Sequence, residues 1–178
     1  MKKILFSLFV ISIALTGCKK DETTSSNNGG GNNNPTTPTY YFSFKANGQL
    51  MEFTNFSAAK DDTLNPSFLF ISAAKALSPD KNFFGITLMK PAAGWGDGTI
   101  FVLDESQLIS KVEYKDDGGF IFKSTAAPAG DGLTINFSKL AINSGGVIEG
   151  TFSGKLKLEE NETRVQITEG KFKIKQMN

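Results

Sequence analysis

Hydrophobic and polar side chains alternate with a period of two along much of the chain from Tyr40 onward. Phe42 and Phe44 alternate with Ser43 and Lys45 near the start of this region. In 148–158, apolar residues and glycines occupy the even positions and polar residues the odd ones. This pattern predicts antiparallel strands with one buried face and one wetted face.

Turn residues separate the alternating segments. Asn47-Gly48 lies between two apolar runs and predicts a hairpin, because a tight two-residue turn needs positive φ at both positions. Residues 104–109 are expected to form a short helix. Strands are expected in 40–45, 50–53, 67–74, 82–89, 99–103, 111–114, 119–123, 133–140, 148–158 and 165–174. The predicted fold is an all-β, antiparallel β-sandwich of about eight to ten strands over residues 40–178.

Composition narrows the chemistry that this domain can perform. The 178 residues include 16 Phe and 18 Gly but no His and one Cys, Cys18. A catalytic triad with His, an internal disulfide and a Cys-rich zinc site are therefore excluded. The 19 basic and 18 acidic side chains nearly balance, which argues against a nucleic-acid partner.

The N-terminus has the layout of a secretory signal. Lys2 and Lys3 precede the apolar stretch 4–15, which is too short for a permanent membrane helix, and small residues follow. Leu15-Thr16-Gly17-Cys18 resembles the lipobox of bacterial lipoproteins. The resemblance implies a signal peptide over 1–17, cleavage before Cys18, and lipidation of Cys18.

Residues 18–39 are expected to be the lipidated cysteine and a flexible linker, because 19–39 contain no aliphatic or aromatic side chain to bury. Lys19 is not the Asp that tends to retain lipoproteins in the inner membrane. The run 19–22 also resembles the export signal, a lysine with two acids, of some Gram-negative lipoproteins. We therefore expect anchoring in the outer membrane, at the cell surface, with the periplasmic face as the alternative.

Two segments of the domain resemble uncharacterised β-sandwich lipoproteins. Their final hairpin carries Gly-x-Phe-x-Gly and Ile-Thr-x-Gly-x-Phe, matched here by residues 150–154 and 167–172. Residues 44–48 are similar to their first hairpin. The resemblance implies the fold and the location but no activity.

Trp95 and Asp97, in the loop 91–98, are the candidate ligand-binding residues. An aromatic ring on a loop can stack on a sugar, and a neighbouring carboxylate can accept hydrogen bonds from its hydroxyls. The alternative interpretation is that Trp95 covers one end of the core, with its N–H bonded to a carbonyl oxygen.

Charged side chains suggest three further sites, each with a simpler structural interpretation. Asp/Gly loops around 61–62, 97, 116–117 and 131 have Ca²⁺-ligand chemistry but no EF-hand spacing, and 116–119 reads as a turn. A lysine row on the last hairpin, from Lys155 to Lys175, suggests an anion-binding face or a solvated one. Paired carboxylates would permit glycoside hydrolysis.

These observations together predict a non-catalytic, membrane-anchored binding or accessory domain, with a glycan or a surface protein as its partner. No cofactor or metal is expected. The alternative prediction is a metal-independent polysaccharide hydrolase that uses two carboxylates.

Overall fold

Alternation of inward and outward side chains produces eleven strands in the part of the chain that the structure describes. The computed structural model describes residues 39–64, 66–76 and 80–177. The strands are β1 (Tyr41–Ala46), β2 (Gln49–Phe53), β3 (Asn55–Asp61), β4 (Phe68–Ala74), β5 (Phe83–Met89), β6 (Ile100–Leu103), β7 (Lys111–Lys115), β8 (Ile121–Lys123), β9 (Leu133–Leu140), β10 (Val147–Leu158) and β11 (Arg164–Met177). A 3-10 turn, η1 (Ser124–Ala126), lies between β8 and β9.

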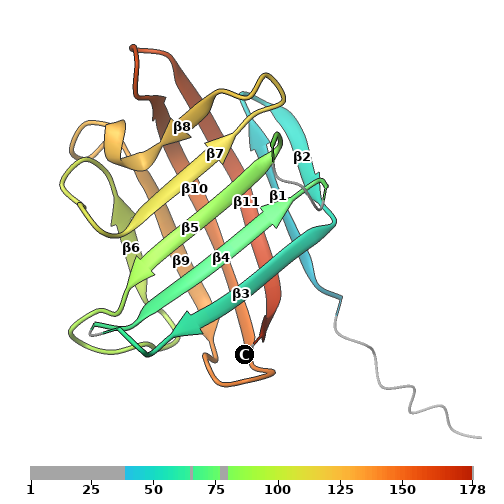
Figure 1. The fold of residues 1–178 in the computed structure, drawn as a ribbon, viewed down its shortest axis with the longest axis vertical. Coiled ribbons are helices and arrows are strands. Elements are labelled where there is room, and N and C mark those ends of the chain that lie inside the picture. The colour runs from blue at the N-terminus through green and yellow to red at the C-terminus, as the bar shows by residue number, and fades with distance from the viewer. Residues whose placement is uncertain (1–38, 65, 77–79, 178) are drawn as a thin grey trace, which may run out of the picture. The chain divides into compact units, whose positions relative to one another are not determined.

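All eleven strands belong to one hydrogen-bonded sheet. Their order is β2-β1-β11-β3-β4-β5-β7-β8-β10-β9-β6, and β10 also pairs with β11. Every pairing is antiparallel except the short one between the end of β11 and β3. In Figure 1, β3, β4, β5 and β7 lie side by side in front of β9, β10, β11 and β1.

The two long strands β10 and β11 connect the strands in front with those behind. The first part of β10 pairs with β9, whereas Lys157 and Leu158 at its end pair with β8. The register of β10 against β11 shifts between Phe152 and Gly154, and Gly154 has a φ of 143°. A Cβ atom at Gly154 would lie 2.2 Å from the carbonyl oxygen of Gly132. The glycine therefore permits both the bulge and the close approach of the neighbouring chain.

Aromatic rings fill the core between the front and rear strands. Phe84 on β5 is fully buried, and its ring centroid lies 4.9 Å from that of Phe44 and 5.5 Å from that of Phe42, both on β1. Phe152 on β10 lies 5.0 Å from the same ring. Aromatic pairs at these distances add to the stabilisation from area burial.

The all-β class and the antiparallel pairing are confirmed. The number of strands is eleven, above the eight to ten expected, and the sandwich arrangement stays a prediction. The strand β3 was not predicted because it lacks an alternating apolar pattern. Its only large apolar side chain is Phe56, and Ala58 is its one fully buried residue.

The prediction of a short helix over 104–109 is wrong. Asp104 Oδ1 accepts hydrogen bonds from the backbone N–H (2.9 Å) and the hydroxyl (2.6 Å) of Ser106, and these bonds close a turn instead of a helix. Its Oδ2 accepts a bond from the N–H of Gly130 at 2.8 Å. These bonds lower the pKa of Asp104, Gly130 contributing most. Local side-chain bonding of this kind competes with helix formation.

The predicted first hairpin is confirmed. Asn47 and Gly48 have φ values of 48° and 84° between β1 and β2, as the tight turn requires. Asn47 Oδ1 also accepts a hydrogen bond from the backbone N–H of Gln166 at 2.8 Å, which ties the turn to β11.

Candidate ligand-binding face

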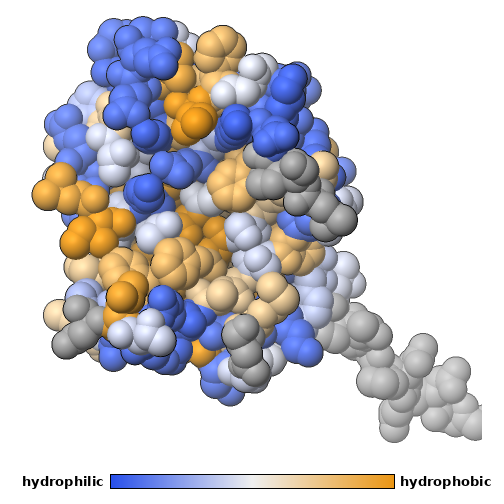
Figure 2. All heavy atoms as spheres, viewed as in Figure 1, coloured by the Kyte–Doolittle hydropathy of each residue, from blue (hydrophilic) through white to orange (hydrophobic). Residues whose placement is uncertain are grey.

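The outer face of β3, β4 and β5 carries aromatic side chains where the alternation of a wetted strand leads one to expect polar ones. Leu69 and Ile71 of β4 are buried. Because successive side chains of a strand point to opposite sides, Phe68 and Phe70 point outward. Phe84 of β5 is buried, so Phe83 points outward too. Phe70 is 39% exposed. We call this surface the aromatic face; Figure 2 looks onto it and shows apolar side chains among polar ones.

The three outward phenylalanines form a row. The rings of Phe68 and Phe70 stack with centroids 6.1 Å apart and planes 21° apart. Phe83 leans along β5 over Gly85, since a Cβ atom there would lie only 2.8 Å from Phe83 Cε1. Gly85 pairs with Ser72, two residues along β4 from Phe70. Phe83 is thereby brought toward the other two rings, and the row follows β4 diagonally onto β5.

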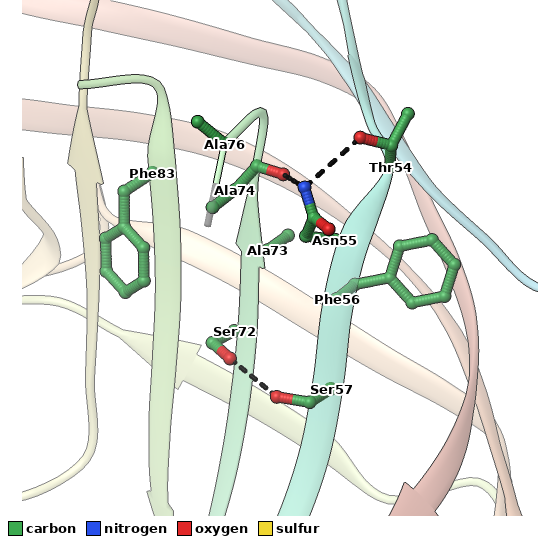
Figure 3. Close-up of a pocket in the computed structure, with 9 residues that line it drawn as sticks. All are labelled: Thr54, Asn55, Phe56, Ser57, Ser72, Ala73, Ala74, Ala76 and Phe83. Carbon is green, nitrogen blue, oxygen red and sulfur yellow. Dashed lines mark hydrogen bonds between the residues drawn. The ribbon is translucent and has the colours of Figure 1, made fainter. Parts of the chain in front are cut away.

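A shallow depression of about 420 Å³ lies beside Phe83 on this face. Its lining residues, drawn in Figure 3, are Thr54, Asn55, Phe56, Ser57, Ser72, Ala73, Ala74, Ala76 and Phe83. None of them is charged. Its polar groups are therefore hydroxyls, an amide and the backbone.

Hydrogen bonds between neighbouring strands hold these polar groups in place. Ser57 on β3 and Ser72 on β4 join their hydroxyls at 2.8 Å, and the Asn55 amide on β3 donates to the carbonyl oxygen of Ala74 on β4 at 3.5 Å (Figure 3). Each of these side chains keeps further capacity to donate or accept. The depression therefore offers both donors and acceptors from a rigid sheet.

A second depression, of about 150 Å³, continues the first. Both are lined by Ser72 and Phe83, and the second also reaches Phe70, Thr87 and the outer side chains of β7. Lys111 and Glu113 of β7 form an ion pair at 3.2 Å, and Lys115, the next outward residue of β7, lies opposite Phe83.

The structure places the predicted residues Trp95 and Asp97 in a loop that packs on the end of the core. Trp95 is half-buried, with its ring centroid 6.3 Å from that of Phe101, and its buried Nε1 has no partner among the described residues. Asp97 Oδ1 accepts a hydrogen bond from the N–H of Leu140 at 2.6 Å. Trp95 thus packs against the core, as the alternative interpretation expects, although its N–H bonds to no carbonyl oxygen among the described residues. The ligand-binding role of the two residues stays a prediction.

The predicted lysine row lies on the outer face of β10, β11 and β1, which we call the charged face. Lys173 pairs with Glu149 at 3.6 Å, and Lys171 lies over the ring of Tyr41 at 5.9 Å from its centroid. Lys155 pairs with Asp131 at 2.5 Å and Lys157 with Glu162 at 2.7 Å. Acids thus balance most of the row, which favours the solvated interpretation over an anion site.

The acidic loops bond to their own surroundings. Asp61 Oδ1 accepts bonds from Thr63, Asp62 pairs with Lys60, and Asp116 Oδ1 accepts from the N–H of Phe120 at 2.9 Å. Across residues 39–177, apart from the few left undescribed, no three acidic, His or Cys side chains are grouped so as to hold a metal.

Cys18, the predicted signal peptide and the linker lie outside the described residues. Within the described part of the chain, no helix has the length and apolar character needed to cross a membrane.

Sequence reasoning missed the aromatic face. The available signal was the segment 67–74, where Phe occurs on the side of the strand opposite Leu69 and Ile71. A second signal was Phe83-Phe84, because two adjacent rings of a strand point in opposite directions and one of them must face outward.

Comparison of the chain with models of protein families, with curated proteins and with solved structures finds no match.

Proposed function

We propose that residues 40–178 form the non-catalytic binding domain of a lipid-anchored outer-membrane protein, and that the aromatic face contacts a glycan or protein partner at the cell surface. The observation that carries this proposal is the row of Phe68, Phe70 and Phe83 on a strand face that points away from the core.

Stability alone does not account for this row. Of the three rings Phe70 is exposed and Phe68 and Phe83 are half-buried, and together they make apolar a strand face where polar residues would be expected. The opposite, charged face shows that this sheet can carry Lys and Glu at equivalent outward positions. Aromatic side chains supply most of the binding energy at many interfaces.

The anchor in this proposal is Cys18 in its lipobox-like setting. Acyl chains contribute about 0.8 kcal/mol per buried CH₂, so several chains on one cysteine hold a protein on the bilayer without a membrane helix. A linker over 18–39 would let the domain reach partners near the membrane.

Among the described residues, the resolved carboxyl pKa shifts are not of the kind that glycoside hydrolysis needs. A hydrolase of this class needs one acid whose pKa is raised, so that it can donate a proton. The pKa of Asp131 is lowered by Lys155 and Arg164, and that of Glu162 by Lys157 and Arg164. In the described region, each carboxyl with a resolved shift has a lowered pKa.

The binding face is tested with the detergent-solubilised full-length protein on an array of glycans and purified cell-surface proteins. We expect Phe70→Ser to weaken the binding that the wild type shows by about tenfold, because one ring of the row is lost. Phe120→Ser is the matched control, because Phe120 is 55% exposed but lies in the β7–β8 turn. Equal binding by wild type and Phe70→Ser, or no binding by the wild type to any probe, contradicts the proposal.

The anchor is tested separately by cell fractionation. The wild-type protein should sediment with outer membranes, and Cys18→Ala should release it from them. A Cys18→Ala protein that still sediments with membranes would show that the attachment does not depend on a lipid at this residue.

A further inference from the structure

We infer that the ligand of the aromatic face is an uncharged oligosaccharide, which stacks sugar rings on Phe70 and Phe83 and bonds to the hydroxyls and amide beside them. This inference rests on the proposed function and narrows its ligand to one chemical class.

The first argument is the charge of the surface. The described residues that line the depression beside Phe83 are all uncharged, and those that line the adjoining depression carry only the paired charges of Lys111 and Glu113. Among the described lining residues of the two depressions, an anionic glycan would find no cation except the paired Lys111, and Lys115 opposite Phe83 adds a single charge beside them. An uncharged sugar carries hydroxyls, and each hydroxyl both donates and accepts, as do Ser57, Ser72 and Thr87.

The second argument is the presentation of the rings. Sugar rings have faces of C–H groups that pack on the electron-rich face of an aromatic ring, which must therefore lie open and roughly parallel to the surface. Phe83 lies along the sheet because Gly85 has no side chain to lift it. Phe68 supports Phe70 from the side by stacking.

The third argument is the length and openness of the site. The row runs along β4 from Phe68 to the level of Ser72, where the tip of the Phe83 ring lies over Gly85, a span of four residue steps or about 13 Å at 3.3 Å per residue. The depressions are shallow and lie along the strands, which suits several sugars in a chain rather than one enclosed small molecule. A protein hot spot, by contrast, is usually a deep, water-excluding pocket for an anchor side chain.

Gly85 acts in this arrangement as a positioning residue. An alanine Cβ at 85 would come within 2.8 Å of Cε1 and 2.9 Å of Cζ of Phe83, both at the far end of a side chain that can rotate away. Gly85→Ala should therefore tip the Phe83 ring off the sheet without disturbing the fold.

A matched control exists at another glycine. An alanine Cβ at Gly118 would lie 3.0 Å from Cδ2 of Phe120, a ring outside the aromatic face. Gly118→Ala repeats the same perturbation where no ligand is expected.

The test is isothermal titration of the full-length protein in detergent with cellohexaose and maltohexaose as uncharged probes and an oligogalacturonate as the anionic one. We expect an uncharged probe to bind and the anionic one not to. Phe70→Ser should weaken binding about tenfold, since one stacked ring is lost. Phe70→Tyr, which keeps the ring, should retain it.

Gly85→Ala should weaken binding severalfold with an unchanged thermal midpoint, and Gly118→Ala should leave binding as in the wild type. An equal loss in both glycine variants would show a general effect on stability and would overturn the role of Phe83.

The remaining outcomes separate the inference from the proposed function. If neither uncharged probe binds, but the anionic probe or an arrayed protein binds through Phe70, the inference fails and the binding function stands. If light scattering shows that Phe70→Ser converts a dimer into a monomer, the face joins two copies of the chain and the inference fails. If Phe70→Ser alters no binding at all, both fail.

Discussion

The aromatic face and the charged face are built by strands of similar alternation, yet their outward residues differ in kind. On β10 and β11, outward Glu149 and Lys173 pair across the strands. On β4 and β5, the outward positions hold Phe70, opposite Thr87, and Phe83, opposite Ala74. Inward residues of both regions meet in one aromatic core. The core therefore does not dictate the composition of the outer faces.

The charged face is what solubility requires. Exposed ion pairs contribute little to stability, but they keep a sheet surface wetted and free of aggregation. The aromatic face carries a solubility cost that a binding function would offset. The difference between the two faces is the main reason to look for a ligand on one and not on the other.

The largest expected effect separates the two sides of a single strand. Phe84→Ala should lower the free energy of unfolding by about 3–5 kcal/mol, because a buried ring contacting β1 and β10 is removed. Phe83→Ala, one residue earlier and outward, should lower it by no more than about 1 kcal/mol. Denaturant titration of both variants measures the difference. A similar loss in both would make Phe83 a core residue and remove the basis of the aromatic face.

A smaller effect is expected in alkali and arises on the front strands. Burial, with contributions from Asp116 and Asp117, raises the pKa of Tyr114 on β7 to about 12. In the unfolded chain the tyrosine loses its proton near pH 10, whereas in the folded protein it keeps the proton to about pH 12. Ionisation therefore stabilises the unfolded state between these two pH values. Stability should be flat up to about pH 10 and should fall as the pH rises toward 12.

Tyr114→Phe is the control for this alkaline loss. The variant cannot ionise at this position, so its thermal midpoint should fall less than that of the wild type between pH 10 and 12. Parallel curves for the two proteins would mean that another group causes the loss.

The smallest effect is expected in acid and arises beside the charged face. Asp131 accepts bonds from Lys155 and Arg164, and these partners lower its pKa. A lowered folded pKa contributes stability that is present above the unfolded value near 3.8 and is lost as the pH falls through the folded value. Asp131→Asn should flatten part of the decline of the thermal midpoint below about pH 4. An unchanged acid profile would show that these exposed pairs contribute nothing measurable.

Local residue patterns determined much of the fold. The alternation in 133–140 and 148–158 predicted β9 and β10 and identified Phe152 as inward. Asn47-Gly48 predicted the first turn. These features follow from period-two geometry and from backbone conformations that few residues adopt, so they are written in short stretches of sequence.

Other features came only from the tertiary structure. The strand β3 exists because β4 pairs with it along its length, although its own sequence lacks the pattern. Asp97 bonds to Leu140, a residue 43 positions away, which no local pattern could indicate. The lysines of β11 lie in the middle of the sheet, between β1 and β10, and not along an exposed edge.

Some features of the candidate site were likewise set by local sequence and others by the tertiary structure. The sequence by itself determined that Phe83 and Phe84 point to opposite sides of one strand, and that the domain has neither His nor Cys for catalysis. The tertiary structure decided that Phe68, Phe70 and Phe83 share one face with Ser57 and Ser72. The physical reason is that alternation along a strand sets which side is buried, whereas the lateral neighbours of that strand depend on pairing between segments far apart in the chain.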